Sequence, residues 1–268
     1  MRKTIRLGLI GKDVSKSLSE KMHTFILNAW GINCEYARFS VAKTDFDTVM
    51  RRLLGDFDGF NVTIPYKKDV FEYLYDIDAD ASACGSVNTV LTDTKQGYNT
   101  DGAGFLLMLQ TAGVEVQGKK VLILGAGGSG RSSAMALKNA GANVYMYRRN
   151  RSELLETCER LGVTPATETE LGGYDIFVNC TGVGMHDTEG KSPVEKAVFQ
   201  GGTWAVDLIY VPEESAFLKQ AKEQGLRTLN GASMLFYQAY FADCLYTQRT
   251  PSIEEAKRLY GAYLKVNK

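Results

Sequence analysis

A glycine-rich run at residues 121–130, which reads VLILGAGGSG, constrains the fold of this chain more than any other feature. Four apolar residues lead into Gly125, Gly127 and Gly130, which follow the GxGxxG spacing. Where a buried strand meets a helix, such glycines permit a tight turn, let backbone N–H groups approach a pyrophosphate, and let the helix pack closely on the strand. The run therefore predicts a dinucleotide-binding turn, composed of Gly125, Ala126, Gly127, Gly128, Ser129 and Gly130.

The sequence after the run supports this interpretation. Helix-forming residues fill 132–139, and residues 143–147 read NVYMY, which is typical of a second strand. Strand, helix and strand in this order make the βαβ unit that the motif requires. The alternative is a glycine-rich strand-to-helix turn that binds nothing.

The end of the second strand indicates which dinucleotide is bound. NAD sites usually place an acidic residue about 20 residues after the first glycines, where it binds the ribose 2′-hydroxyl. Here that corner holds no carboxylate and three arginines, Arg148, Arg149 and Arg151. Guanidinium groups suit a 2′-phosphate, so we expect NADP. The alternative is a solvated basic loop.

Composition excludes several classes of protein. The 268 residues are 44% hydrophobic, enough for two modest domains, and 31 basic residues balance 31 acidic ones. This balance argues against nucleic acid or a membrane surface as a partner. Because no apolar stretch approaches the roughly 20 residues of a membrane span and no signal-peptide core is found, we expect a cytoplasmic protein.

Cysteine and histidine usage argues against a metal or a disulfide framework. The cysteines are odd in number, widely spaced and without a CxxC pair: Cys34, Cys84, Cys158, Cys180 and Cys244. The two histidines, His23 and His186, share no ligand-like spacing with each other or with the cysteines. We therefore expect reduced thiols and no metal site.

Alternating patterns predict an α/β fold of two domains. Strands are expected at 5–10, 34–41, 59–63, 87–92, 143–147, 175–179 and 203–208, and helices near 19–30, 45–54, 101–112, 233–248 and 252–263. We expect an N-terminal α/β substrate-binding domain and a Rossmann-type, doubly wound dinucleotide-binding domain, with the C-terminal helices returning to the first domain. The predicted boundaries are 1–103 with 233–268, and 104–232.

Three polar segments of the first domain lie where its strands should end. They are residues 11–19 (GKDVSKSLS), residues 61–67 (NVTIPYK), and residues 87–89 together with 99–101 (VNT and NTD). Each has an ordinary explanation by itself: Ser19 and Asp101 as helix N-caps, Asn61 and Thr63 as turn formers, and Lys67 as a solvated lysine. Together they offer hydroxyls, amides, an ammonium and a carboxylate, which would suit a polyhydroxylated carboxylic acid.

The order and spacing of these motifs resemble the shikimate dehydrogenase family. The resemblance rests on NVTxPxK at 61–67, GxVNT at 85–89, GxNTD at 97–101 and the glycine-rich turn. Further along, the family's NATxxGM, DxxYxP and closing segments resemble NCTGVGM at 179–185, DLIYVP at 207–212 and GASMLFYQA at 231–239. Nearly the whole chain is covered.

The resemblance implies an NADP-dependent alcohol oxidoreductase that interconverts 3-dehydroshikimate and shikimate in aromatic amino-acid biosynthesis. It also implies that Lys67 and Asp101 jointly form the acid–base pair beside the reacting hydroxyl. Such a pair suits the chemistry, because a proton must move when a hydride is exchanged with a nicotinamide.

The same family likeness assigns the remaining site residues. Ser17 and Ser19 would bind the substrate carboxylate. Thr63, Asn88 and Gln238 would bind ring hydroxyls, with Tyr210 as an additional substrate contact. The residues that would line the nicotinamide end are Thr181, Met185 and Gly231. Monomer and homodimer both suit the resemblance.

The chain departs from the family at two places. Lys16 and Glu20 stand where HSxSP would place histidine and proline, and RRN at 148–150 replaces NRT, with Glu153 where a basic residue is common. Arg148 and Arg151 would then have to compensate. A quinate/shikimate dehydrogenase, or another relative acting on a similar cyclic polyol acid, is therefore an alternative. A non-catalytic dinucleotide-dependent sensor is a more distant one, since mere binding would not require the Lys67–Asp101 pair.

Overall fold

The chain folds into two compact α/β units. The computed structural model describes residues 4–267. Unit 1 runs up to Gly104 and resumes at Phe236, and unit 2 is Phe105–Leu235. The unit boundaries fall inside two helices, α4 (Asp101–Thr111) and α8 (Ala232–Thr247). Most of α8 and all of the C-terminal helix α9 (Ile253–Val266) belong to unit 1, as the sequence led us to expect.

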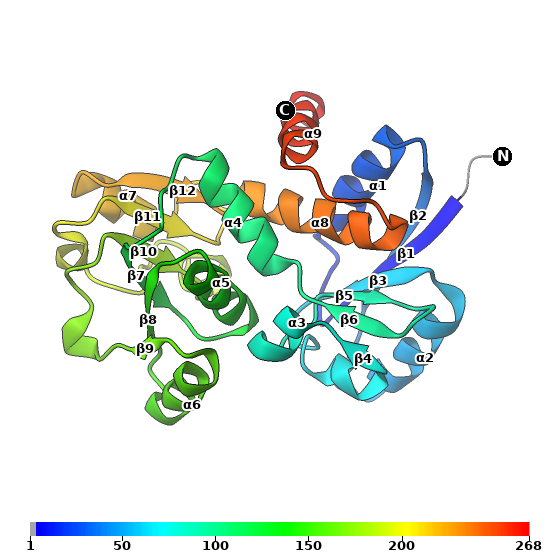
Figure 1. The fold of residues 1–268 in the computed structure, drawn as a ribbon, viewed down its shortest axis with the longest axis horizontal. Helices are drawn as coiled ribbons and strands as arrows, with labels where there is room; N and C mark the ends of the chain where they lie inside the picture. The colour runs from blue at the N-terminus through cyan, green and yellow to red at the C-terminus, as the bar shows by residue number, and fades with distance from the viewer. Residues whose placement is uncertain (1–3, 268) are drawn as a thin grey trace. The chain divides into compact units, whose positions relative to one another are not determined.

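Unit 1 contains a six-stranded mixed sheet (Figure 1). Its strands, in spatial order, are β2 (Asn33–Ser40), β1 (Thr4–Gly11), β3 (Gly59–Val62), β5 (Thr89–Leu91), β6 (Gln96–Tyr98) and β4 (Asp76–Ile77). β1 is parallel to β2 and β3, whereas β5 is antiparallel to β3 and β6. The ends of β1, β3 and β6 and the start of β5 therefore lie at one edge of the sheet, where the three polar segments emerge.

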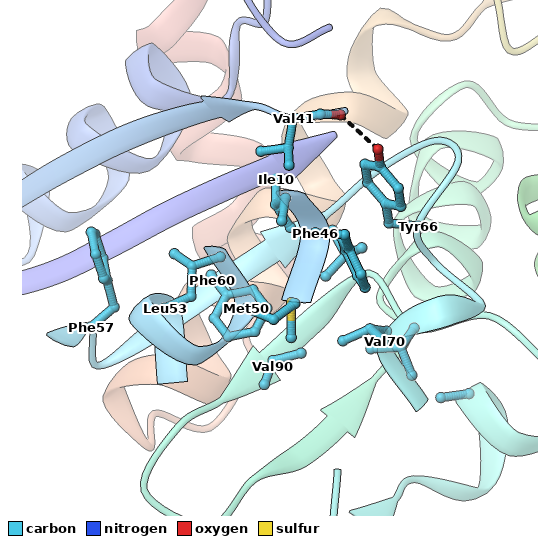
Figure 2. Close-up of a cluster of buried hydrophobic side chains, with 13 residues drawn as sticks. Ile10, Val41, Phe46, Met50, Leu53, Phe57, Phe60, Tyr66, Val70 and Val90 are labelled. Atoms are coloured by element: carbon cyan, nitrogen blue, oxygen red, sulfur yellow. Dashed lines mark hydrogen bonds between the residues drawn. The ribbon is translucent and has the colours of Figure 1, made fainter. Parts of the chain in front are cut away.

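Helices cover this sheet and bury its core. α1 (Ser19–Ala29) packs on β2 and on α9, and α2 (Phe46–Asp56) packs on β3. A short helix, α3 (Ala79–Cys84), contacts β6. Phe46, Met50 and Leu53 are spaced for one face of α2, and this face is buried against apolar strand residues (Figure 2).

Tyr66 joins this core to a polar segment. Its ring stacks on Phe46 with the centroids 4.3 Å apart, and its hydroxyl donates a 2.6 Å hydrogen bond to the carbonyl of Val41 (Figure 2). Since Tyr66 is fully buried, the backbone immediately before Lys67 is anchored in the interior.

Unit 2 is a six-stranded, wholly parallel sheet. Its order is β12 (Arg227–Asn230), β11 (Trp204–Asp207), β10 (Ile176–Asn179), β7 (Lys120–Leu124), β8 (Asn143–Tyr147) and β9 (Thr164–Pro165). The covering helices are α5 (Gly128–Asn139), α6 (Arg151–Leu161) and α7 (Ala216–Glu223). The strand order reverses between β7 and β10, and such a switch point is where doubly wound sheets bind dinucleotides.

The expected fold class is confirmed, and the sequence missed mainly short elements. The strand expected at 87–92 is shorter in the structure, where β5 spans Thr89–Leu91. The two- and three-residue strands β4 and β6, the helix α3 and the strand β12 were not expected. Among the described residues, no helix is long and apolar enough to span a membrane.

Two glycine substitutions in unit 1 should have opposite effects on stability. A Cβ on Gly59 would lie 2.3 Å from Cε1 of the partly buried Tyr246 and 3.0 Å from the Val90 carbonyl oxygen. We expect Gly59→Ala to lower the free energy of unfolding by about 1–3 kcal/mol through overpacking. Gly55→Ala is the control, because Gly55 lies in α2 with open space around it. This substitution should raise the free energy of unfolding by about 0.5–1 kcal/mol. Urea unfolding measures both, and equal effects would contradict the packing argument.

Candidate active site

The central feature of unit 1 is an ion pair between Lys67 and Asp101. Lys67 follows β3 through the turn anchored by Tyr66, and Asp101 is the first residue of α4. Lys67 Nζ donates to Asp101 Oδ2 at 2.5 Å, and the two side chains are only 16% and 8% exposed. Lys67 is therefore not a solvated lysine. Ion pairs so largely removed from water are kept only where geometry and further hydrogen bonds compensate for desolvation.

Asn88 supplies the further hydrogen bonds. Its amide nitrogen donates to Asp101 Oδ1 at 2.7 Å and to Thr100 Oγ1 at 3.0 Å. Its carbonyl oxygen accepts from the Thr100 backbone at 2.9 Å and from Thr89 Oγ1 at 2.9 Å. Both carboxylate oxygens of Asp101 thus have donors, one of them Lys67. The arrangement can present an ammonium in a fixed orientation to a substrate oxygen.

Gln238 lies beside this cluster because α4 and α8 approach closely. A Cβ on Gly104 would lie only 2.7 Å from the backbone nitrogen of Gln238. Gln238 Oε1 accepts a long hydrogen bond of 3.5 Å from Asn88 Nδ2. Sequence reasoning missed Gly104, although a glycine one turn into a helix that starts at a candidate catalytic aspartate could have pointed to it.

The turn after β1 brings the two predicted serines together. Ser17 Oγ is 3.0 Å from Ser19 Oγ and accepts from the Ser19 backbone nitrogen at 3.2 Å. The N-cap of α1 is Leu18, so the Ser19 hydroxyl does not cap the helix. A Cβ on Gly11 would lie 2.5 Å from the Thr63 methyl group, which shows that the turns after β1 and β3 are in contact.

The two departures beside these serines have simple structural explanations. Lys16 is exposed, and Glu20 forms an ion pair with Arg38, Nε to Oε2 3.2 Å. Both side chains are therefore accounted for without a role in binding.

In unit 2 the glycine-rich turn has the geometry that the motif predicts. Gly125 has a φ of +102°, which L side chains rarely adopt, and a Cβ on Gly130 would lie 2.2 Å from the Gly125 carbonyl oxygen. A Cβ on Gly127 would meet nothing within 4 Å, so the space above the N-terminus of α5 is open. These residues fit a pyrophosphate, with the turn closed by two glycines and the approach left clear by the third.

The three arginines after β8 differ in what they contact. Arg148 forms an ion pair with Glu153, and Arg151 Nη1 donates to the Ala166 carbonyl at 3.0 Å. Arg149 is exposed, and within residues 4–267 its side chain takes part in no hydrogen bond or ion pair. Arg149 is consequently the arginine best placed to bind a phosphate, and the idea that Arg148 compensates for Glu153 gains no support.

A buried polar network orders the loops after β10 and β11. Asp207 Oδ1 accepts from Asn179 Nδ2 and from the Ile209 backbone, both at 3.0 Å, and Asp207 Oδ2 accepts from Ser215 Oγ at 2.5 Å. Asn179 Oδ1 accepts from the backbone and the hydroxyl of Thr181 at 3.0 and 2.7 Å. Burial raises the pKa of Asp207 from 3.8 to about 6, opposed by these hydrogen bonds.

This network fixes the segments that carry the predicted nicotinamide-end residues. Thr181, Met185 and Gly231 all follow strand ends at one edge of the unit 2 sheet, and so does Tyr210, the predicted substrate contact. Gly231 packs against the backbone of Leu208, because a Cβ there would lie 2.2 Å from its carbonyl oxygen. Sequence reasoning assigned no role to Asp207, yet its register opposite Asn179 on the adjacent strand could have predicted the pairing.

No disulfide joins any of the five cysteines, all of which lie within the described residues. Across the described part of the chain, no group of three or more His, Cys, Asp or Glu side chains could hold a metal ion.

The fold and these side chains define a class: two-unit α/β proteins that combine a Rossmann-type dinucleotide-binding unit with a second unit holding a largely buried Lys–Asp pair. A family model described as the shikimate dehydrogenase substrate binding domain matches residues 9–90. A relative from Carboxydothermus hydrogenoformans, named Shikimate dehydrogenase (NADP(+)), is 39% identical over 95% of both chains. The chain belongs to the shikimate dehydrogenase family.

Solved structures agree with this membership. The shikimate 5-dehydrogenase of Thermus thermophilus, in complex with NADP(H) and shikimate, has a TM-score of 0.88 and 31% identity, covering 97% of this chain and 99% of that one. The quinate dehydrogenase of Corynebacterium glutamicum, in complex with NAD, has a TM-score of 0.85 and 26% identity, covering 97% of this chain and all of that one.

The raised pKa of Asp207 predicts a pH dependence of stability. Between pH 4 and 6 the folded state retains a proton that the unfolded chain has released, so this carboxyl's contribution is present below about pH 4 and lost as the pH rises through 6. Relative to Asp207→Asn, the wild-type free energy of unfolding should fall by up to about 3 kcal/mol from pH 4 to 7. Urea unfolding across this range measures the difference, and parallel curves for the two proteins would refute it.

Proposed function

We propose that this chain catalyses the reversible, NADP-dependent reduction of 3-dehydroshikimate to shikimate, a step of aromatic amino-acid biosynthesis. The observation that carries the proposal is the 2.5 Å Lys67–Asp101 pair, held by Asn88 in a unit matched by the family's substrate-binding model. Residues 1–103 and 233–268 would bind the substrate, and residues 104–232 would bind NADP.

The proton is handled by the Lys67–Asp101 pair acting jointly. NADPH, when bound, supplies the hydride that reaches the carbonyl carbon. Lys67 Nζ hydrogen-bonds the carbonyl oxygen, stabilises the negative charge that grows on it, and donates the proton that completes the hydroxyl. Asp101 holds the ammonium in place, and the same nitrogen takes the proton back when shikimate is oxidised.

The remaining residues of unit 1 would bind the rest of the substrate. Ser17 and Ser19 would donate their hydroxyls to the carboxylate, and this role is supported because Ser19 is not used as a helix cap. Thr63, Asn88 and Gln238 would bind ring hydroxyls, and Tyr210 of unit 2 would add a further contact. Amide and hydroxyl groups serve both as donors and as acceptors, which a polyol requires.

In unit 2 the glycine-rich turn would bind the pyrophosphate and the arginine corner the 2′-phosphate. Arg149 would make the main contact, since Arg148 and Arg151 already have partners. Thr181, Met185 and Gly231 would line the nicotinamide end.

A quinate/shikimate dehydrogenase is the second candidate. It is supported by the similarity to the Corynebacterium glutamicum quinate dehydrogenase, and the same lysine, aspartate and glutamine would serve either acid. We also propose that the protein is cytoplasmic, which cell fractionation would test. It would be a monomer or a homodimer, and light scattering would distinguish the two.

One assay separates these candidates. Absorbance of reduced nicotinamide is followed with shikimate or quinate and NADP⁺ or NAD⁺, and kcat/KM is compared for the four pairs. The highest value with shikimate and NADP⁺ supports the proposal. Preference for quinate or NAD⁺ supports the second candidate, and no turnover with any pair would support a non-catalytic sensor.

Removing the ammonium should abolish most of the turnover. Lys67→Ala should lower kcat by about 10²–10⁴-fold, the usual range for a positioned acid–base group, and leave the affinity for NADP⁺ nearly unchanged. Lys68→Ala is the matched control, because this neighbouring lysine is exposed. Near-normal turnover of Lys67→Ala would exclude Lys67 from the mechanism.

Cofactor preference should depend on one arginine. Arg149→Ala should weaken NADP⁺ binding about tenfold or more, since a hydrogen bond to a charged group contributes roughly 1.5–3 kcal/mol, and should change NAD⁺ binding little. Arg160→Ala, an exposed arginine at the end of α6, is the control. Titration by calorimetry gives both affinities, and equal losses for NADP⁺ and NAD⁺ would show that Arg149 does not bind the 2′-phosphate.

A further inference from the structure

A fully buried histidine–aspartate pair lies in unit 1, outside the residues assigned above. His23 of α1 and Asp243 of α8 are in contact, Nδ1 to Oδ1 2.6 Å, and their side chains are 1% and 0% exposed. His23 Nε2 and Asp243 Oδ2 have no hydrogen-bond partner among the described residues. Such a pair is costly to bury, and apolar residues of similar size often give equal or greater stability. Stability alone therefore does not account for it.

The position of the pair along its two helices suggests a role. His23 lies one turn after Ser19 on α1, and Asp243 lies five residues after Gln238 on α8. The pair therefore joins the helix that carries a proposed carboxylate ligand to the helix that carries a proposed hydroxyl ligand. Because both side chains are fully buried and their atoms are in direct contact, the spacing of α1 and α8 is fixed at this point.

A second set of contacts leads from His23 to the Lys67–Asp101 pair. The Tyr36 ring stacks on His23 with the centroids 5.0 Å apart, and its hydroxyl donates to Asn61 Oδ1 at 3.1 Å. The amide of Asn61 donates to the backbone carbonyl of Asn88 at 3.2 Å. Asn88 donates a hydrogen bond to Asp101. A shift of His23 would therefore alter the position of Asp101 in the acid–base pair.

We propose that His23 and Asp243 are positioning residues that set the separation between the two ends of the substrate site, and so determine how well the acid substrate fits. This inference rests on the proposed function. The pair does not touch the substrate in our assignment, and it acts through Ser19, Gln238 and the Tyr36–Asn61–Asn88 contacts.

The test uses a variant that keeps the interior free of unpaired charge. His23→Leu/Asp243→Leu removes both polar groups together, and its thermal unfolding midpoint should be close to or above that of wild type. We expect the KM for shikimate to rise between about tenfold and about a hundredfold, as misplacement of a site can cause, while the KM for NADP⁺ stays within about twofold. Calorimetric titration with shikimate should show the same loss of affinity without any turnover being required.

Tyr246→Phe is the matched control. It deletes a buried hydroxyl on α8, three residues from Asp243, that has no hydrogen-bond partner within the described part of the chain, and it should leave both KM values unchanged.

The outcomes separate the two proposals. A folded double variant with wild-type KM for shikimate overturns the positioning role, and so does an equal rise of both KM values, which would indicate general loosening. A wild-type chain that neither turns over nor binds shikimate overturns the proposed function and this inference together. An active wild type with a selective loss in the double variant supports both.

Discussion

The Lys67–Asp101 contact is the interaction around which the polar side chains of the candidate site in unit 1 are arranged. An ammonium and a carboxylate that are mostly removed from water are costly to bury unless each is held by fixed partners. Asn88 supplies them for the carboxylate, and the buried Tyr66 fixes the backbone that carries the lysine. The core and the candidate site are therefore coupled. The stack of Tyr66 on Phe46 at the start of α2 fixes the backbone next to Lys67.

Strand direction explains why so many polar side chains lie together. In unit 1 the parallel ends of β1 and β3 and the start of the antiparallel β5 share an edge, and in unit 2 every strand ends on the same side. Each unit thus brings the polar side chains that follow its strands together at one edge of its sheet. The Asp207–Asn179 network shows the cost of this plan, because loops leaving adjacent buried strands need polar partners that are themselves buried.

The sequence was informative where structure is local. The βαβ pattern around the glycines and the long strands and helices were predicted because period and turn chemistry act over a few residues. Strands of two or three residues, such as β4 and β6, leave no periodic pattern. Contacts between residues far apart in the sequence could not be predicted either. His23 and Asp243, for example, are 220 positions apart. The sequence also could not show which arginine lacks a partner. Arg148 is paired with the Glu153 carboxylate, and that contact is visible only in the structure.

The close crossing of α4 and α8 at Gly104 limits how this family member can diversify. With hydrogen as the only side chain that fits against the backbone of Gln238, a residue of any size at 104 would push the two helices apart. Asp101 and Gln238 would then separate, although neither had been altered. Substrate specificity can therefore change more easily through substitutions in the loops that follow the strands than through substitutions in α4 and α8. A loop side chain can be replaced without moving a neighbouring helix.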